Sequence, residues 1–538
     1  MDVFLPGTGV RDFVTRREWL RDTRRGLHGG CVACPFVQGE QEGHPLGEGL
    51  YAAFRVTAMS APRASAVVGH DGITWSYEEL LAAVDAAAER LSGRFEPGDV
   101  LGLAADDPGT FLALYLAAAR LDIVTVLLDS RLSAAELERS AAKFDLAWLA
   151  VDRRPDDPCA AGGFELEAVD GARTHRGRAL SRYAADDFVV HCTSGSTGEP
   201  KGIVMSQAAI EARVRLWSGE LALGPEDVVL CALPLAHCHG IDVLTLPALL
   251  NGATVVFARA GRLTGRGLAR QIDRHGVTLM SGLPVMYQML TAAGGAPATS
   301  LKTLRMAISG SAPLATSTQE EFLRRYGLPL RQVYGLSEIG VICFDKRYVG
   351  GGSIGKPIAG VEWRLEPVAD ANPAQDGSEP EPLHELYVRG PALARGYYDE
   401  PAATAEMFED GWLRTRDIIR ADPEGWYVRG RQSGFINVAG NKVGPLEVEA
   451  ALRECPGVLE SAVVGIPDPG TTERVAALIV TDGAFELGAV QRRLADRLLS
   501  YQLPQRYETV ATLPRTPLGK TDYAAVKRLL HTHEGDDT

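Results

Sequence analysis

The sequence lacks the features that would assign it to a membrane, to secretion or to a nucleic acid. No run approaches the roughly 18 consecutive apolar residues of a membrane span. Six arginines within residues 1–25 stand among acidic residues without an apolar core, which argues against a signal or transit peptide. A net charge of −14 offers no basic face for nucleic acid or an anionic bilayer. We therefore expect a cytoplasmic protein with neither a nucleic-acid nor a membrane partner.

A disulfide or zinc framework is also missing. Of the eight cysteines, only Cys31 and Cys34 form a C-x-x-C pair, and no second pair stands at zinc spacing. Reduced thiols in a cytosolic protein are the simplest interpretation. No fixed-period repeat occurs, which argues against a solenoid. A chain of 538 residues, 46% hydrophobic and 23% charged, is typical of a globular protein with two or three domains.

What the chain does contain is a loop rich in glycine and hydroxyl groups, residues 193–202, directly after the apolar run 188–190. The run predicts a buried strand. The loop's glycines let backbone N–H groups approach an anion, its hydroxyls add donors, and Lys201 adds a positive charge. This composition predicts a phosphate-binding loop, although the Walker pattern fits nowhere in it. A flexible linker is the alternative, which the preceding strand and the Pro-Lys-Gly end disfavour.

These residues resemble the signature loop of the adenylate-forming superfamily, which includes acyl- and aryl-CoA ligases and stand-alone adenylation enzymes. In that family the loop holds the β- and γ-phosphates of ATP. The resemblance implies that the nucleotide is bound by Thr193, Ser194, Gly195, Ser196, Thr197, Gly198 and Lys201. It also implies that Thr193 is a catalytic residue.

A second match is Tyr-Gly-Leu-Ser-Glu at 334–338, which resembles the family's Y-G-x-T-E. The resemblance implies that Tyr334 stacks on adenine and Ser337 touches phosphate. It also implies that Glu338 is catalytic and holds Mg²⁺, a hard cation that prefers carboxylate and phosphate oxygens. Gly335 is expected beside both the nucleotide and the substrate.

The small-residue turn after the apolar segment 306–308 is a weaker match. Its flat backbone would let an adenine ring lie against it, as the corresponding family element does. The residues expected to bind nucleotide here are Ser309, Gly310 and Ser311, and Gly310 is also expected in the substrate pocket.

Further motifs follow toward the C-terminus. Residues 411–417 resemble G-W-x-x-T-G-D, with Arg416 where glycine is usual, so that Asp417 would accept hydrogen bonds from both ribose hydroxyls. Arg431 would contact ribose or the α-phosphate. Ser433 stands at the expected hinge, where the family usually has Asp or Lys. Lys520, in a segment resembling L-P-x-T-x-x-G-K, would hold the carboxylate against the α-phosphate as a catalytic and nucleotide-binding residue.

The substrate pocket has two candidates besides Gly310 and Gly335. His237 lies in a P-x-x-H-x-x-G element that covers the acyl pocket in the family and is expected to be catalytic; a histidine packed at a strand end is the alternative. Asp242 follows in an apolar stretch. A buried carboxylate needs a partner, which could be a substrate ammonium, or Asp242 could be an N-cap or first-turn acid of the helix through Leu250. The two interpretations stand equal at this point.

The element pattern predicts an α/β fold. Strand-like 100–103, an apolar helix at 110–121 and the run 123–128 alternate as in parallel α/β layers. We expect a large multi-layer N-terminal domain with mixed sheets and a small α+β C-terminal domain, joined by a hinge. The expected divisions are an extension at 1–45, the large domain at 46–431, the small domain at 432–530 and a tail at 531–538.

The motifs occur in family order across nearly the whole chain beyond the extension. The resemblance therefore implies an ATP- and Mg²⁺-dependent ligase that converts a small carboxylic acid to acyl-AMP. The acyl group would pass to a thiol, either coenzyme A or phosphopantetheine on an acyl carrier protein. An amide synthetase with an amine acceptor and a non-catalytic nucleotide-binding protein are the alternatives. The absence of an F-D-x-S pattern disfavours an ordinary α-amino acid; the identity of the acid, the acceptor and the oligomeric state stay open.

Overall fold

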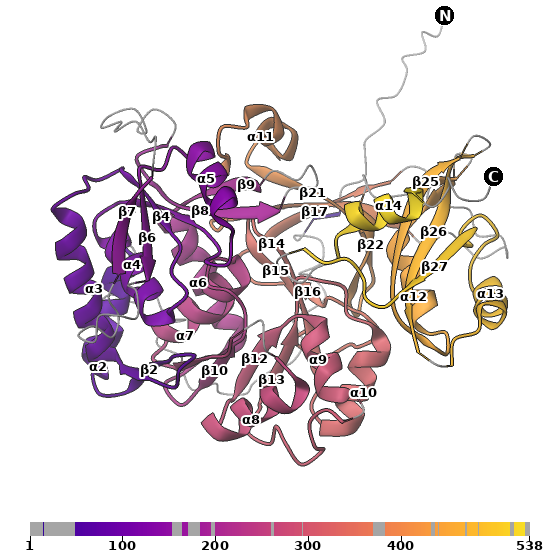
Figure 1. Ribbon diagram of the computed structural model, residues 1–538, viewed down its shortest axis with the longest axis horizontal. Helices are drawn as coiled ribbons and strands as arrows, with labels where there is room; N and C mark the ends of the chain where they lie inside the picture. The colour runs from indigo at the N-terminus through magenta and orange to yellow at the C-terminus, as the bar shows by residue number, and fades with distance from the viewer. Residues whose placement is uncertain are drawn as a thin grey trace, which may run out of the picture.

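A large domain and a smaller C-terminal lobe make up the computed structural model (Figure 1). It describes residues 14–15, 49–152, 164–169, 183–194, 200–259, 263–292, 294–368, 382–431, 436–438, 441–468, 471–482, 484–516 and 521–532. The predicted fold class, a large mixed α/β domain with a small α+β domain, is confirmed. No helix in these ranges combines the length and the apolar character that a bilayer crossing requires.

The first sheet of the large domain has parallel strands at its centre and contains the two strands that flank the predicted phosphate loop. Its order in the described chain is β19-β9-β8-β5-β4-β6-β7. The strands are β4 (Val100–Leu103), β5 (Val124–Leu127), β6 (Trp148–Asp152), β7 (Phe164–Ala168), β8 (Asp187–Ser194), β9 (Pro200–Ser206) and β19 (Gly396–Tyr397). Strands β8 and β9 pair in antiparallel orientation and precede and follow residues 195–199 in the sequence.

The second sheet has the order β16-β15-β14-β13-β12-β10-β11-β2-β3 within the described residues. The strands are β2 (Ser65–Val68), β3 (Thr74–Ser76), β10 (Val228–Cys231), β11 (Thr254–Phe257), β12 (Leu279–Gly282), β13 (Met306–Ser309), β14 (Leu330–Leu336), β15 (Gly340–Phe344) and β16 (Lys356–Pro357). Strands β10 to β13 pair in parallel and are buried on both faces, which explains their continuous apolar sequences.

Helices fill the space between these two sheets and cover their outer sides. The helices of this part are α2 (Leu50–Ser60), α3 (Tyr77–Ser92), α4 (Pro108–Arg120), α5 (Ala134–Lys143), α6 (Gln207–Leu221), η2 (His239–Thr245), α7 (Leu246–Leu250), α8 (Gly265–His275), α9 (Pro284–Thr291) and α10 (Thr316–Tyr326). One hydrophobic core joins α4, α6 and α7 to strands of both sheets, so α4 is apolar on every side. A second core packs α8, α9 and α10 against the other face of the second sheet.

The local sequence explains where the main helices begin. Ser76 and Glu79 form a capping box at the start of α3, in which each side chain bonds the other's backbone N–H. Asp107 caps α4 and Pro108 occupies its first turn, where a missing N–H costs nothing.

A third, antiparallel sheet closes the large domain. In the described chain its order is β1-β17-β18-β21-β20, with β22 paired to β21. The elements are β1 (Val14–Thr15), β17 (Glu362–Pro367), β18 (Leu383–Arg389), α11 (Pro401–Met407), β20 (Phe408–Glu409), β21 (Trp412–Ala421) and β22 (Trp426–Arg431). Part of the N-terminal extension thus forms a strand, which pairs with β17.

The small lobe has a separate core and follows β22, drawn in orange to yellow in Figure 1. Its elements are β23 (Ile436–Val438), β24 (Asn441–Val443), α12 (Pro445–Arg453), β25 (Val458–Asp468), β26 (Thr472–Thr481), α13 (Leu487–Ala495), β27 (Arg506–Val510) and α14 (Tyr523–Thr532). The last helix, α14, ends at Thr532. Val526 and Leu530 bury the apolar face of α14 against β25 and β26.

Candidate active site

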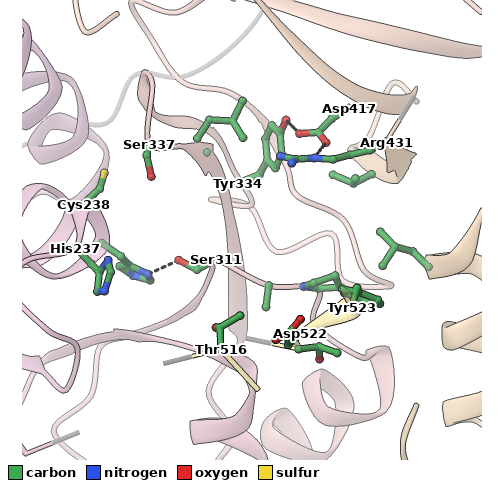
Figure 2. A pocket seen from close by; sticks show the side chains of 18 of the residues that line it. His237, Cys238, Ser311, Tyr334, Ser337, Asp417, Arg431, Thr516, Asp522 and Tyr523 are labelled. Carbon is green, nitrogen blue, oxygen red and sulfur yellow. Dashed lines mark hydrogen bonds and ion pairs between the residues drawn. The ribbon is translucent and has the colours of Figure 1, made fainter. Parts of the chain in front are cut away.

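A cleft of about 2190 Å³ lies between the large domain and the small lobe. On the large-domain side its walls follow the carboxyl ends of β10, β13 and β14, where parallel strands commonly present ligand-binding loops. Thr516, Asp522 and Tyr523 of the small lobe stand across from Tyr334 and Ser337 of the large domain (Figure 2). The cleft therefore brings together residues predicted from several separate motifs.

Three of the predicted nucleotide-binding residues contact one another directly. Tyr334 on β14 donates its hydroxyl hydrogen to Asp417 Oδ2 at 2.5 Å, and Arg431 Nε donates to Asp417 Oδ1 at 2.7 Å (Figure 2). Asp417 and Arg431 are cross-strand partners in the β21–β22 ladder, which fixes their separation. Burial and the adjacent Asp417 raise the pKa of Tyr334 well above its usual value, so the phenol stays protonated and donates.

Arg416, directly before Asp417, stands where the G-W-x-x-T-G-D pattern has glycine. Arg416 has φ of 60°, in the left-handed region that glycine enters without strain. Its guanidinium forms an ion pair with Glu406 on α11. The backbone thus keeps a conformation suited to glycine, although the side chain is arginine.

Glu338, the predicted metal ligand, lines the cleft and is held by a residue that sequence reasoning missed. Tyr397 donates its hydroxyl hydrogen to Glu338 Oε1 at 2.7 Å. The ring of Tyr397 also lies below Lys201, with 5.3 Å between Nζ and the ring centroid. Because 59 residues separate Tyr397 from Glu338, no local pattern could have shown this contact.

The opposite wall contains His237 and a second histidine, His239, that the sequence analysis did not single out. His237 Nε2 lies 4.0 Å from Asp129 Oδ2, and its side chain is 23% exposed. His239 bonds Ser311 Oγ through Nδ1 and Ser281 Oγ through Nε2, each at 2.8 Å. Ser311, predicted in the adenine turn, therefore ties that turn to the wall containing His237.

The small residues of the two turns are required by close packing. A Cβ atom on Gly310 would lie 2.5 Å from the Val333 side chain, and one on Gly335 would lie 2.2 Å from the Gly340 carbonyl oxygen. Ser309 is buried at the end of β13, with 1% of its surface exposed, whereas Ser311 lines the cleft. Of the two hydroxyls in this turn, that of Ser311 is the one that faces the cleft.

The ammonium-binding hypothesis would place the Asp242 carboxylate in the cleft, but Asp242 is not among the residues that line it. The side chain is fully buried behind the cleft wall, in the first turn of η2. Arg213 Nη1 lies 2.7 Å from its Oδ2, and His191 Nε2 lies 3.1 Å from the same atom. Burial alone would raise the pKa of Asp242, but His191 and Arg213 outweigh it and lower the pKa to about 2.

This environment favours one of the two interpretations of Asp242. A carboxylate that already has two buried basic partners, and no exposed surface, fits the alternative interpretation of a structural first-turn acid. The other Arg213 nitrogen, Nη2, donates to the Ser337 carbonyl oxygen at 2.9 Å. The buried pair therefore supports the turn that carries Ser337 and Glu338.

Several predicted residues lie outside what the structure describes. These are Gly195, Ser196, Thr197, Gly198, Ser433 and Lys520, together with the side chains of Thr193 and Ser194. Their roles stay predictions. Thr516 and Thr521, on either side of the segment that contains Lys520, line the cleft.

Comparison with known protein families matches both domains. The family described as AMP-binding enzyme matches residues 54–398, and the AMP-binding enzyme C-terminal domain matches residues 447–520. A feruloyl-CoA synthase from Amycolatopsis sp. is 30% identical over 491 residues, which cover 88% of this chain and 97% of that protein.

Two solved structures are also similar. The o-succinylbenzoate CoA synthetase of Bacillus subtilis, in complex with its acyl-adenylate intermediate, has a TM-score of 0.72 and 25% identity, covering 88% of this chain and 97% of that one. The amide bond synthetase McbA of Marinactinospora thermotolerans has a TM-score of 0.74 and 26% identity, covering 89% of this chain and 99% of that one.

Proposed function

The chain belongs to the AMP-binding enzyme family, the adenylate-forming ligases, and from this premise we propose that it joins a small carboxylic acid to coenzyme A, with Mg²⁺ as the metal. It is an ATP-dependent acid–thiol ligase that forms an acyl-adenylate and releases AMP. We further propose that the acceptor is free coenzyme A, that the metal is Mg²⁺, and that individual residues of the cleft have the following roles.

The contact of Tyr334, Asp417 and Arg431 in one cleft carries the proposal. An aromatic ring, a carboxylate with further lone pairs and a partly exposed guanidinium are the groups that adenine, the ribose hydroxyls and the α-phosphate require. Both Asp417 oxygens are already oriented by protein donors, so the carboxylate needs little reorganisation when ribose hydroxyls bind. The three residues would thus fix the adenylate end of the substrate.

Glu338 fits a divalent cation. Its Oε2 has no hydrogen-bond partner in the described part of the chain, while Oε1 is held by Tyr397. No group of three potential metal ligands occurs among the described residues, which agrees with a hard cation bound by one carboxylate and the nucleotide phosphates. When bound, the cation would neutralise phosphate charge; Lys201 would add a second positive charge on the same side.

Lys520 and the hinge complete the proposed mechanism. Lys520 would place a positive charge beside the α-phosphate while the substrate carboxylate attacks and pyrophosphate leaves. Rotation of the small lobe about Ser433 would then move Lys520 away from the reaction centre. Another face of the lobe, the one that admits the thiol, would take its place. His237 would cover the acyl pocket during the first step.

Pyrophosphate exchange tests the first half-reaction. We expect ATP–pyrophosphate exchange with at least one acid from a panel of aromatic, fatty and short dicarboxylic acids. Lys520→Ala should lower that rate by roughly two to three orders of magnitude, the usual scale for losing a preorganised charge. Thioester formation from supplied acyl-AMP should fall far less, and equal loss in both steps would contradict the role.

The acceptor needs its own test because a similar structure is an amide bond synthetase. Purified acyl-AMP should give product with free coenzyme A in preference to a pantetheine-loaded carrier protein or to amines. Amide formation that outpaces thioester formation would replace the coenzyme A proposal and leave the adenylation step intact. A faster reaction with the carrier protein would make phosphopantetheine the acceptor.

A further inference from the structure

Tyr397 occupies a fixed position between two of the predicted ATP-binding elements. It lies on β19, which pairs with β9, the strand that begins at Pro200 within the last part of the predicted phosphate loop. The backbone N–H of Tyr398 donates to the Gly202 carbonyl at 2.7 Å, and that of Arg395 donates to the Val204 carbonyl at 3.0 Å. The Tyr397 N–H donates to Thr404 Oγ1 of α11 at 3.0 Å. Its backbone is therefore bound from both sides.

The same segment holds Glu338 at two points. The Ala394 N–H donates to the Glu338 carbonyl oxygen at 2.7 Å, and the Tyr397 hydroxyl donates to Glu338 Oε1 at 2.7 Å. One bond fixes the backbone of this residue and the other fixes its carboxylate. Only the second bond depends on the identity of a side chain.

The surroundings of Tyr397 keep its hydroxyl a donor and its ring in place. The hydroxyl donates because its partner, the Glu338 carboxylate, can only accept, and Oε1 lies 2.7 Å away. Phe408 packs edge-on against the ring, with 5.7 Å between centroids, and the Lys201 ammonium lies over it. A phenylalanine could keep both ring contacts and lose only the hydrogen bond.

We propose that Tyr397 is a positioning residue that holds the Glu338 carboxylate for the divalent cation accompanying ATP. The inference rests on the proposed function, because it concerns the metal of that reaction. One carboxylate oxygen accepts the tyrosine hydrogen bond, and the other is left to the metal. Through its ring the same residue sets the position of the Lys201 charge relative to this carboxylate.

The test measures metal binding directly, without turnover. Mn²⁺ binding to the full-length protein with α,β-methylene-ATP is followed by electron paramagnetic resonance, and binding of the analogue without metal is measured separately. Tyr397→Phe should weaken Mn²⁺ binding about 10-fold, the lower end for losing a hydrogen bond to a metal ligand. Affinity for the metal-free analogue and the thermal unfolding midpoint should stay at the wild-type values.

Tyr51 supplies a matched control. Its hydroxyl donates to Asp85 Oδ1 at 2.7 Å, and Arg120 lies 5.0 Å from its ring centroid, so the chemistry matches that of Tyr397 at a site outside the cleft. Tyr51→Phe should leave Mn²⁺ binding unchanged. In a Glu338→Gln background, Tyr397→Phe should cause no further loss, because the two residues act as one unit.

Two results would overturn the proposal: wild-type Mn²⁺ affinity in Tyr397→Phe, or an equal loss of affinity for the metal-free analogue, which would indicate a general structural role. A wild-type protein that binds the analogue neither with nor without Mn²⁺ would instead refute the proposed function itself. The two failures are therefore distinguishable in the same experiment.

Discussion

Two aspartate–arginine pairs in the large domain have the same length and different surroundings. Asp417 and Arg431 are 2.7 Å apart at the cleft, and the Arg431 side chain is 58% exposed. Asp242 and Arg213 are also 2.7 Å apart, but the Arg213 side chain is 2% exposed and the pair lies behind the wall. The two pairs thus differ in the exposure of the arginine, and in the proposed function only the pair with the exposed arginine binds a ligand.

The largest expected difference between the pairs is in stability. Arg213→Ala should lower the free energy of unfolding of the large domain by about 3–5 kcal/mol, because it leaves the buried Asp242 carboxylate without one of its two basic partners. Arg431→Ala should cost about 1 kcal/mol or less, since water can solvate the exposed position. Urea unfolding followed by tryptophan fluorescence measures both. Equal losses would show that the two pairs are equivalent.

The second difference is in nucleotide binding. Asp417→Asn should raise the KM for ATP by roughly 10- to 100-fold, the equivalent of about 1.5–3 kcal/mol for hydrogen bonds to a charged group. Its unfolding transition should stay close to that of the wild type. Pyrophosphate exchange at varied ATP gives the KM. An unchanged value would remove Asp417 from the ribose site.

The third difference is in acid stability. The pKa of Asp242 in the folded protein, about 2, lies below that of a carboxyl in the unfolded chain. The ionised carboxylate therefore contributes fully to the free energy of unfolding above about pH 4, and this contribution is lost as the pH falls through about 2. Asp242→Asn should abolish this part of the pH dependence, which amounts to about 2 kcal/mol. Denaturation at a series of pH values between 6 and about 2 gives the slopes.

The same variant decides whether Asp242 also affects the substrate. Because the carboxylate does not line the cleft, the ratio of kcat/KM for an amino acid and its deamino analogue should not change. A shift toward the deamino acid by about 10-fold or more, the worth of a hydrogen bond to a charged group, would restore the ammonium-binding hypothesis.

The smallest expected effect concerns the strained residue beside the exposed pair. Arg416→Gly should be more stable than Arg416→Ala by about 1 kcal/mol, because both lose the ion pair with Glu406 and only alanine keeps the cost of positive φ. Thermal unfolding of the two variants measures the difference. A more stable alanine variant would indicate that this backbone conformation carries no strain.

The sequence by itself determined the fold class and one wall of the cleft. Tyr334, Asp417 and Arg431 each stand in a short motif, and a motif can be recognised because its residues are neighbours along the chain. The strands around 188–190 and 306–308 could be predicted for the same reason, since periodicity and glycine placement are local properties.

Only the tertiary structure decided which side chains face the cleft and which support it from behind. Asp242 and Asp417 are both buried acids, but only Asp417 lines the cleft, and the arginines that pair with them come from elements far apart in sequence, α6 for Arg213 and β22 for Arg431. Tyr397 and His239 were missed because each acts through a partner more than 40 residues away. Packing sets such contacts, because a side chain's burial and hydrogen bonds depend on what the whole fold places against it.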